Sequence, residues 1–180
     1  MFLNIITPCS RPQNLIKISK SINIPTENYR WFVVFDMDEF PSKELIPDIC
    51  EIYLHRNPNS KVGHSQRNFA LDLIEKGHVY MNDDDTIIHP ELWNNIKDLD
   101  NDFINFNQSS LNGDSRLIGG NIQVGNIDSH NFIVSRNLIG DSRWIFDRYD
   151  ADGFFAVECY SKCKSPIIIN KYLSIYNQLR

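Results

Sequence analysis

The first hundred residues alternate between short apolar runs and segments whose apolar positions recur at helical spacing. The apolar runs predict four strands, at 2–7, 31–36, 50–56 and 78–83. The helical spacing predicts three helices, at 12–22, 65–77 and 90–99. Strands and helices that alternate in this way predict an α/β fold with a mostly parallel central sheet.

The helix predicted over 65–77 has the clearest boundaries of the three. Ser65 stands where an N-cap residue belongs, and Gly77 stands where helices commonly end. The apolar stripe of this helix consists of Phe69, Ala70, Leu73 and Ile74. We therefore expect one face of the helix to pack on the sheet.

The pattern changes after residue 100. Apolar runs joined by Gly, Asn and Asp turns predict strands at 102–108, 116–125 and 129–136, which we expect to form hairpins. A helix at 152–162 and a last strand at 166–170 complete the chain. The prediction is one domain with an α/β first half and a mixed, β-rich second half.

Composition and charge exclude several classes of protein. No apolar run reaches the roughly 20 residues of a membrane span, and the start reads as a first strand without the basic region of a signal peptide. The net charge of −5, without a Lys/Arg stripe, argues against a nucleic-acid partner. The four cysteines form no CxxC pair, so we expect free thiols in a reducing, cytoplasmic location.

Carboxylates gather where two predicted strands end. Asp36 ends the strand at 31–36, and Asp83, Asp84 and Asp85 end the strand at 78–83 with no Gly to form a turn. Parallel sheets bind ligands at this edge. Strand alternation would point Asp83 and Asp85 to one side, where two carboxylates suit Mg²⁺ or Mn²⁺. The alternative is a solvated Asp turn without a ligand.

Arg67 falls in the first turn of the helix predicted at 65–77. The helix dipole disfavours a cation there, so its position favours a bound anion such as pyrophosphate. An ion pair with an acidic neighbour explains the same residue equally well.

One segment resembles the first motif of the haloacid-dehalogenase phosphatases. In "FVVFDMDEF", Asp36 would be the nucleophile and Asp38 the general acid, with "NDDD" at 82–85 as the Mg²⁺ site. Glu39 and Phe40 depart from this motif, and little chain separates Asp38 from the second acidic site. A non-catalytic sugar-nucleotide or glycan-binding module is a further alternative.

Four segments in order resemble the GT-A glycosyltransferases, and most closely the glucuronyltransferase group. They are "TPCSRPQNL" (7–15), "WFVVFD" (31–36), "GHSQRNFALDLIEKGHVYMNDDDTIIHPELW" (63–93) and "GGNIQVG" (119–125). Members of the group show a Thr-Pro-x-x-x-Arg-Pro start and a Tyr-x-x-Asp-Asp-Asp strand end. Several motifs in the right order are more specific than one acidic motif.

This resemblance implies a single GT-A, Rossmann-like domain over residues 1–180. Residues 1–100 would be the nucleotide-sugar-binding half and residues 101–180 the acceptor-side half. The donor would be a nucleoside-diphosphate sugar, most simply a UDP-sugar, the acceptor a glycan or other hydroxyl compound, and the cofactor Mn²⁺ or Mg²⁺. The glucuronyltransferase likeness implies inversion at the anomeric carbon.

The resemblance also assigns roles in nucleotide binding. Thr7, Pro8 and Arg11 would line the nucleotide pocket. Asp36 would accept a hydrogen bond from the base. Arg67 would face the diphosphate or stabilise the loop beneath it.

The acidic motif would hold the metal. Asp83 and Asp84 would contact the ribose and the metal shell, and Asp85 would be the direct metal ligand. His130 could complete the metal shell or touch the phosphate. A hydrogen bond within a turn is the alternative for this histidine.

The acceptor side requires a base to take the proton of the attacking hydroxyl. Asp152 is the candidate, with Asp150 and Glu158 as competitors, whereas the family usually has Glu at this place. A helix N-cap is the alternative role for Asp152. Trp144 is the candidate for stacking on a sugar.

Overall fold

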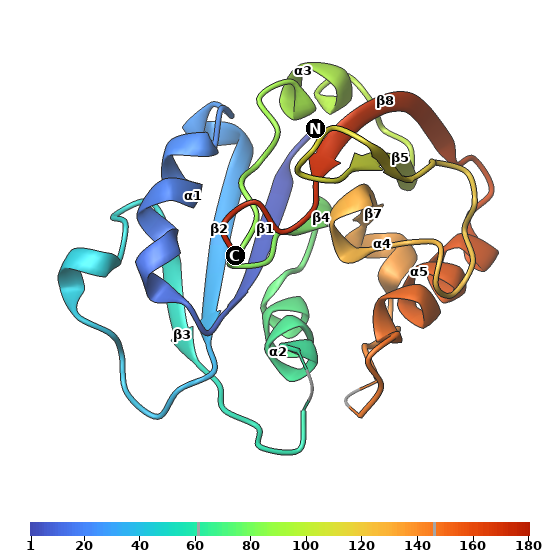
Figure 1. The fold of residues 1–180 in the computed structure, drawn as a ribbon. Helices are drawn as coiled ribbons and strands as arrows, with labels where there is room; N and C mark the ends of the chain where they lie inside the picture. Colours follow the sequence, from blue (N-terminus) through green and yellow to red (C-terminus); the bar gives the residue numbers. More distant parts are fainter. Residues whose placement is uncertain (61, 146) are drawn as a thin grey trace.

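A computed structural model describes residues 1–60, 62–145 and 147–180, and their strands form one sheet (Figure 1). The strand order is β3-β2-β1-β4-β7-β5-β6, and β8 also pairs with β5. The strands are β1 (Leu3–Cys9), β2 (Tyr29–Phe35), β3 (Glu51–Leu54), β4 (His78–Met81), β5 (Phe103–Ser109), β6 (Ser115–Leu117), β7 (Phe132–Ser135) and β8 (Ile167–Ile175).

The helices connect and cover these strands. The α-helices are α1 (Leu15–Ser21), α2 (His64–Leu73), α3 (Leu92–Ile96), α4 (Arg136–Ile139) and α5 (Ala151–Lys162). Short 3₁₀ turns are η1 (Pro12–Asn14), η2 (Thr26–Asn28), η3 (Lys43–Leu45) and η4 (Ser129–Asn131). No helix of the described ranges is long and apolar enough to cross a membrane.

The sheet is parallel in its first half and mixed in its second. Strands β3, β2, β1 and β4 pair in parallel, as the sequence predicted. β7 pairs antiparallel with β4 and β5, and β6 pairs antiparallel with β5. β8 returns parallel to β5. The predicted mixed α/β fold, with its parallel sheet and β-rich end, is confirmed.

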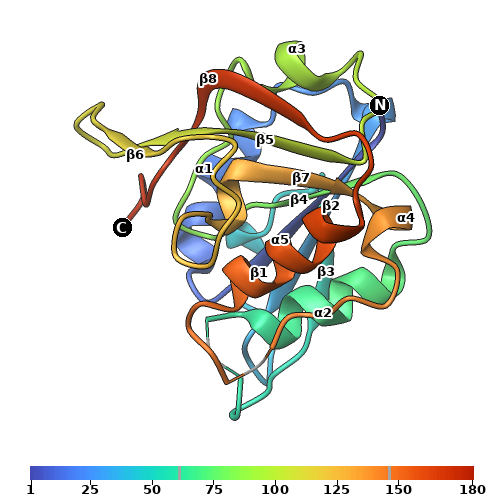
Figure 2. The same cartoon turned by 90° about the vertical axis from the view of Figure 1, so that its right-hand side faces the viewer.

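Two apolar clusters cover the two faces of the sheet. Successive side chains of a strand point to opposite faces, so Ile5 packs in one cluster and Ile6 in the other. Helices α1 and α3 contribute to the cluster of Ile5, and α2 and α5 to that of Ile6. Figure 2 shows α2 and α5 in front of the strands, on the same side of the sheet. The central strands are therefore buried on both faces.

Two buried polar side chains lie within the apolar strand β1. The Asn4 amide Nδ2 donates to the carbonyl oxygens of Lys76, at 2.9 Å, and His78, at 3.1 Å. The Thr7 hydroxyl accepts a hydrogen bond of 2.9 Å from the Trp31 indole. Both side chains are therefore satisfied inside the core, as buried polar groups must be.

Helix α2 begins and ends earlier than predicted. Its N-cap is Gly63, and Ser65 lies inside the first turn, where its amide donates to the Ser60 hydroxyl at 2.9 Å. The helix stops at Leu73. Gly77 serves the entry into β4, where its φ of 92° and the Phe2 carbonyl oxygen leave no room for a side chain.

The hairpin expected between 116–125 and 129–136 does not form among the described residues, since β6 pairs with β5 and β7 pairs with β4 and β5. The other corrections concern lengths. The helix predicted at 90–99 is only Leu92–Ile96, and the last strand extends to Ile175. The strand predicted at 116–125 ends at Leu117. Beyond it the amides of Gly119 and Gly120 donate to the side chains of Asn107 and Asn105, at 2.8 and 2.6 Å. These side chains replace the backbone partners that a longer strand would need.

Gly63 allows the loop before α2 to lie against β1. We therefore expect a side chain at this position to destabilise the protein. The φ of Gly63 is 76°, and an added Cβ would lie 2.5 Å from the Pro8 Cβ. We expect Gly63→Ala to lower the free energy of unfolding by about 2–5 kcal/mol, from left-handed backbone strain plus overpacking. Denaturant unfolding measures this loss.

Gly113→Ala is the matched control for this prediction. Its φ of 85° is similar, but nothing lies within 4 Å of the added Cβ. Gly113→Ala should lower the free energy of unfolding only by the cost of the left-handed backbone, about 1–2 kcal/mol. Equal losses in the two variants would show that the contact with Pro8 is unimportant.

Candidate functional site

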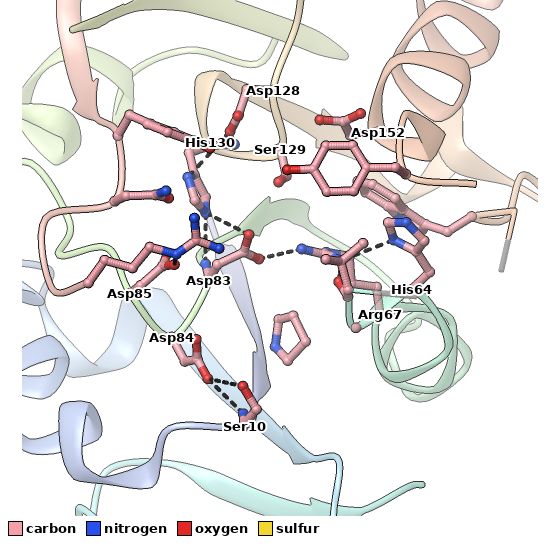
Figure 3. Close-up of a pocket in the computed structure, with 18 of the residues that line it drawn as sticks. Ser10, His64, Arg67, Asp83, Asp84, Asp85, Asp128, Ser129, His130 and Asp152 are labelled. Carbon is pink, nitrogen blue, oxygen red and sulfur yellow. Dashed lines mark hydrogen bonds and ion pairs between the residues drawn. The ribbon is translucent and has the colours of Figure 1, made fainter. Parts of the chain in front are cut away.

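A cleft of about 370 Å³ lies at the carboxyl ends of β1, β2 and β4 (Figure 3). The loops after these strands contribute Pro8 to Arg11, Asp36 and Asp83 to Asp85. The first turn of α2, the segment around η4, the start of α5 and the C-terminal turn complete the walls. The volume is that of a small-molecule site, at the edge where parallel sheets bind ligands.

Asp83 is the centre of a charge cluster in which Arg67 and His130 are buried and Asp83 is half-buried. Its carboxylate pairs with Arg67, whose side chain is 3% exposed, and lies 3.2 Å from the His130 Nε2. Figure 3 shows Arg67 and His130 on opposite sides of Asp83. Burial alone would raise the pKa of Asp83, but the two cations hold it well below its usual range. Asp83 is therefore a carboxylate at neutral pH.

Asp84 and Asp85 have different partners. The Asp84 Oδ2 accepts hydrogen bonds from the amides of Ser10, at 2.6 Å, and Arg11, at 2.7 Å. The Asp85 Oδ2 lies 2.7 Å from the Arg11 guanidinium and 3.3 Å from that of Arg180. Each carboxylate of the motif is thus neutralised by groups of this chain.

The expected alternation of Asp83 and Asp85 to one side is wrong. β4 ends at Met81, so the three aspartates lie in the turn that follows it and not in the strand. Arg11 Nη1 contacts both Asp84, at 3.1 Å, and Asp85. Asp83 faces the other way, toward Arg67.

Asp83, Asp85 and His130 were expected to hold a metal ion, and each has partners within the protein. Within residues 1–60, 62–145 and 147–180, no three His, Cys, Asp or Glu side chains are arranged to hold a metal ion. His130 is 1% exposed, and its Nδ1 lies 3.3 Å from the Asp128 carboxylate. Both ring nitrogens of His130 therefore face acidic residues within the protein, and its role as a metal ligand stays a prediction.

The charge state of His130 follows from its two carboxylate neighbours. The Asp83 amide lies 2.9 Å from Nε2 and would donate to a neutral ring, whereas a protonated ring donates from Nε2 to the Asp83 carboxylate. Burial lowers the pKa of His130, but Asp83 and Asp128 outweigh it and raise this pKa to about 9. We favour the charged ring because two carboxylates flank it.

Arg67 lies in the first turn of α2 and forms an ion pair with Asp83, which was one of the two explanations for its position. Its Nη1 donates to the Val62 carbonyl at 2.7 Å and lies 3.2 Å from the His64 Nδ1. Burial and Arg67 lower the pKa of His64 to about 4, so this ring is neutral and accepts from Arg67. Arg67 therefore fixes the loop before α2 to the loop after β4.

The structure separates the three candidate bases. Asp152 lines the cleft, and burial raises its pKa to about 6. Asp150 also lines the cleft, but it is ion-paired with Arg148 at 3.0 Å. Glu158 lies outside the cleft and pairs with Lys162 and Ser142.

Asp152 is not the N-cap of α5. That position belongs to Asp150, and Asp152 is the second residue of the helix, where its Oδ1 accepts from the Gly153 amide at 2.8 Å. The half-buried carboxylate faces the cleft with no cation paired to it among the described residues (Figure 3). A carboxylate with a raised pKa in a cleft is suited to take a proton.

The remaining expected residues divide between cleft and core. Pro8, Arg11 and Asp36 line the cleft, and Asp36 is exposed. Thr7 does not, because its fully buried side chain bonds to the Trp31 indole. Trp144 is 2% exposed, so it cannot offer a free face to a sugar.

Several lining residues were missed by the sequence analysis. Arg116 pairs with Asp128 at 3.1 Å, Arg180 pairs with Asp85, and Ser10 donates to Asp84. Ser10 lies in the "TPCSRP" segment, which gave a signal for it. Nothing local distinguished Arg116, Asp128 or Arg180.

The described residues of the C-terminal turn close one side of the cleft. The Leu179 amide donates to the Asp85 carbonyl at 2.7 Å, and the Ile87 amide donates to the Gln178 side chain at 3.3 Å. The Arg116 guanidinium stacks over the Tyr176 ring at 3.7 Å. The segment after β8 is therefore bound directly to the loop of the aspartates.

Solved structures share this fold, although no family model and no curated protein sequence matches the chain. S. aureus TarS 1–349 in complex with UDP-GlcNAc has a TM-score of 0.77 at 16% identity, over 97% of this chain and 58% of that chain. The same protein in complex with UDP gives a TM-score of 0.75 at 16% identity, over 97% and 60%.

A third similar structure is the mannosyltransferase PcManGT from Pyrobaculum calidifontis, in complex with GDP-Man and Mn²⁺. It has a TM-score of 0.68 at 14% identity, over 97% of this chain and 56% of that chain. The present chain thus spans 56–60% of the length of these three structures. At such identities the likeness establishes the fold.

Proposed function

We propose that this chain transfers a sugar from a nucleoside-diphosphate sugar, most simply a UDP-sugar, to a hydroxyl group of an acceptor. The observation that carries the proposal is Asp152, a half-buried carboxylate in a cleft at the carboxyl ends of parallel strands, with no ion-pair partner among the residues that the structure describes. Support comes from the solved structures of the same fold that contain UDP, UDP-GlcNAc or GDP-Man. The sequence resemblance to GT-A glycosyltransferases points to the same activity.

The donor would occupy the end of the cleft formed by the loops after β1, β2 and β4. Asp36 is exposed there and would accept a hydrogen bond from the base. Arg11 lines the same end with a side chain that is 32% exposed, so it can reach the diphosphate. Arg67 and Asp84 are held by protein partners, and we assign them to the support of these loops.

A divalent cation would bind at Asp85. Mg²⁺ and Mn²⁺ take oxygen ligands and are commonly held by one or two carboxylates together with substrate phosphates and water. Asp85 is the candidate because its carboxylate lines the cleft, and a cation there would take the place of the Arg11 or Arg180 guanidinium that now contacts it. When bound, the cation would neutralise the charge that develops on the leaving diphosphate.

Asp152 would serve as the base of the transfer step. The acceptor oxygen forms a bond to the anomeric carbon while the bond from that carbon to the diphosphate oxygen breaks. The electron pair of the broken bond leaves with the nucleoside diphosphate, and the proton of the acceptor hydroxyl passes to Asp152. Attack from the face opposite the diphosphate inverts the anomeric carbon.

The phosphatase alternative is less well supported. It requires Asp38 to act as an acid beside Asp36, but Asp38 is outside the cleft and pairs with Arg56 on the surface. A binding module without activity would share the donor site and would not depend on Asp152. We therefore prefer the transferase.

Nucleotide binding provides the first test of this proposal. We expect UDP, GDP or one of their sugar derivatives to stabilise the protein by about 2.7 kcal/mol at about 100 times its Kd. For a chain of this size that stabilisation raises the Tm by roughly 5–10 °C. Thermal unfolding should be measured with each nucleotide, with Mn²⁺ and with EDTA. A Tm that no nucleoside diphosphate moves would contradict the proposal.

Asp36→Asn and Asp38→Asn form a matched pair for this test. Both carboxylates follow β2, but only Asp36 lines the cleft. The Asn amide oxygen still accepts a hydrogen bond but carries no charge, so Asp36→Asn should weaken nucleotide binding by about 1–1.5 kcal/mol, the difference between a charged and a neutral hydrogen bond. Asp38→Asn should bind as the unmodified protein does. Product formation, followed as release of the nucleoside diphosphate, then separates a transferase from a binding module.

A further inference from the structure

Two exposed apolar side chains stand in the wall of the cleft. Among the described residues, Val62 and Tyr149 are the large hydrophobic residues that both line the cleft and are exposed, at 53% and 72%. The other apolar lining residues, such as Ile127 and Trp144, are buried. Exposed single apolar residues are ordinary on a surface, but two in one cleft wall suggest a contact for a ligand.

The loops that carry these side chains are fixed to each other. The His64 Nε2 donates to the Arg148 carbonyl at 2.8 Å, which joins the segment of Val62 to that of Tyr149. The Arg148 guanidinium stacks over the Phe154 ring at 4.2 Å and pairs with Asp150. Tyr149 is therefore held from both neighbouring residues while its own ring stays exposed.

The backbone of Val62 is also unusual. Its φ is 41°, in the left-handed region that β-branched residues disfavour. The Val62 carbonyl accepts from Arg67, so the charge cluster holds this conformation in place. Strain of this kind is concentrated at functional sites.

The surrounding charges indicate what kind of molecule would bind there. Asp150 and Asp152 line the same wall, and the exposed Asp147 lies in the same loop. Arg143 and Arg148 are the cations in the described part of this loop, and they are already paired with Asp72 and Asp150. An anionic ligand would therefore meet uncompensated negative charge, whereas an uncharged one would not.

We propose that Tyr149, with Val62 beside it, forms an acceptor subsite for an uncharged pyranose. A pyranose ring has an apolar C–H face that can stack on an aromatic side chain, and hydroxyl groups at its edge. Stacked on Tyr149, the ring presents a hydroxyl toward Asp152 on the same wall. The inference rests on the proposed transferase function and adds the class of acceptor.

Saturation-transfer NMR with simple sugars tests this subsite. The probes are methyl β-D-glucopyranoside, methyl β-D-galactopyranoside and methyl N-acetyl-β-D-glucosaminide, each in the presence of UDP. We expect ring C–H signals of at least one probe to receive saturation from the unmodified protein. Tyr149→Ala should weaken that probe by roughly 2- to 12-fold, the range for an aromatic contact, and Tyr149→Phe should retain it.

Three controls make the result specific. Tyr172→Ala removes a tyrosine that is 41% exposed but lies outside the cleft, and it should leave binding unchanged. Acyclic ribitol, which has no flat ring face, and methyl β-D-glucuronide, which is charged, should bind more weakly than the neutral probe. Equal binding of the glucuronide would overturn the assignment to an uncharged ring.

The same samples distinguish the two proposals. If UDP raises the Tm but no neutral pyranoside binds, or binding is unchanged in Tyr149→Ala, the acceptor subsite is wrong and the transferase proposal stands. If no nucleoside diphosphate raises the Tm, the transferase proposal itself fails. UDP stabilisation in every variant, with pyranoside binding reduced only in Tyr149→Ala, is the expected result.

Discussion

Asp152→Asn is expected to abolish most of the transfer activity and at the same time to stabilise the protein. Loss of a general base lowers kcat by about 10²–10⁴-fold. Burial, with a smaller contribution from Asp128, raises the pKa of Asp152 to about 6 from an ordinary value of 3.8. Because the folded state favours the protonated form, the ionised carboxylate destabilises it at neutral pH. The neutral amide removes this effect, which we put at roughly 1–3 kcal/mol.

The pH dependence follows from the same shift. The stability difference between Asp152→Asn and the unmodified protein should be absent below pH 3.8, grow as pH rises and be complete above about 6. The activity of the unmodified protein should rise through pH 6 as Asp152 ionises. Initial rates and thermal unfolding across pH 3–8 measure both effects.

Asp150→Asn is the control for both measurements. Asp150 lines the same cleft but is exposed to solvent and paired with Arg148. Its replacement should change stability by no more than about 0.5 kcal/mol and should leave the pH profile in place. If Asp150→Asn loses activity and Asp152→Asn keeps it, the base has been assigned to the wrong carboxylate.

Arg67→Met is expected to cause the largest loss of stability. It leaves the Asp83 carboxylate, whose side chain is 29% exposed, with His130 as its remaining cation and removes the hydrogen bond from the buried Arg67 to the Val62 carbonyl. Breaking a buried ion pair from one side costs about 3–5 kcal/mol, and the remaining His130 favours the lower end of that range. The Tm should fall by roughly 6–12 °C, as differential scanning calorimetry can measure.

Arg143→Met tests whether burial is the cause. Arg143 pairs with Asp72 at 2.6 Å, but the Asp72 side chain is 63% exposed. Its loss should change stability by at most about 1 kcal/mol. The double variant Arg67→Met/Asp83→Asn should recover part of the loss of Arg67→Met, since no unpaired carboxylate remains. A loss as large in Arg143→Met would argue against this account.

The order of strands and helices in the first half of the fold was predictable, because each element has its own pattern of apolar residues in the sequence. Continuous apolar runs such as 31–36 belong to strands covered on both faces, and the helices between them show their buried stripe in the sequence. The ends of elements were less predictable. Helix α2 begins at His64, after an N-cap glycine that lies against Pro8, and a helical pattern gives no information about that contact.

The position of the site in the fold was predictable from the sequence, but the partners of its side chains were not. That acidic residues gather after β4 can be read from "NDDD", and the cleft lies there. The partners of these residues come from far along the chain, such as Arg11, His130 and Arg180. Sequence spacing gives no information about such pairs, so the metal set Asp83, Asp85 and His130 could not be checked before the fold was known.

The two polar side chains inside β1 have a consequence for the cleft above them. Both faces of this strand are apolar and covered, so shifting it by one residue along β2 and β4 would still bury hydrocarbon. Asn4 and Thr7 oppose such slippage, because each would lose its hydrogen bond in the interior. A slip of one residue is about 3.3 Å, enough to carry the amides of Ser10 and Arg11 away from Asp84. The alignment of the binding loops is therefore fixed inside the core, by an amide and a hydroxyl that do not line the cleft.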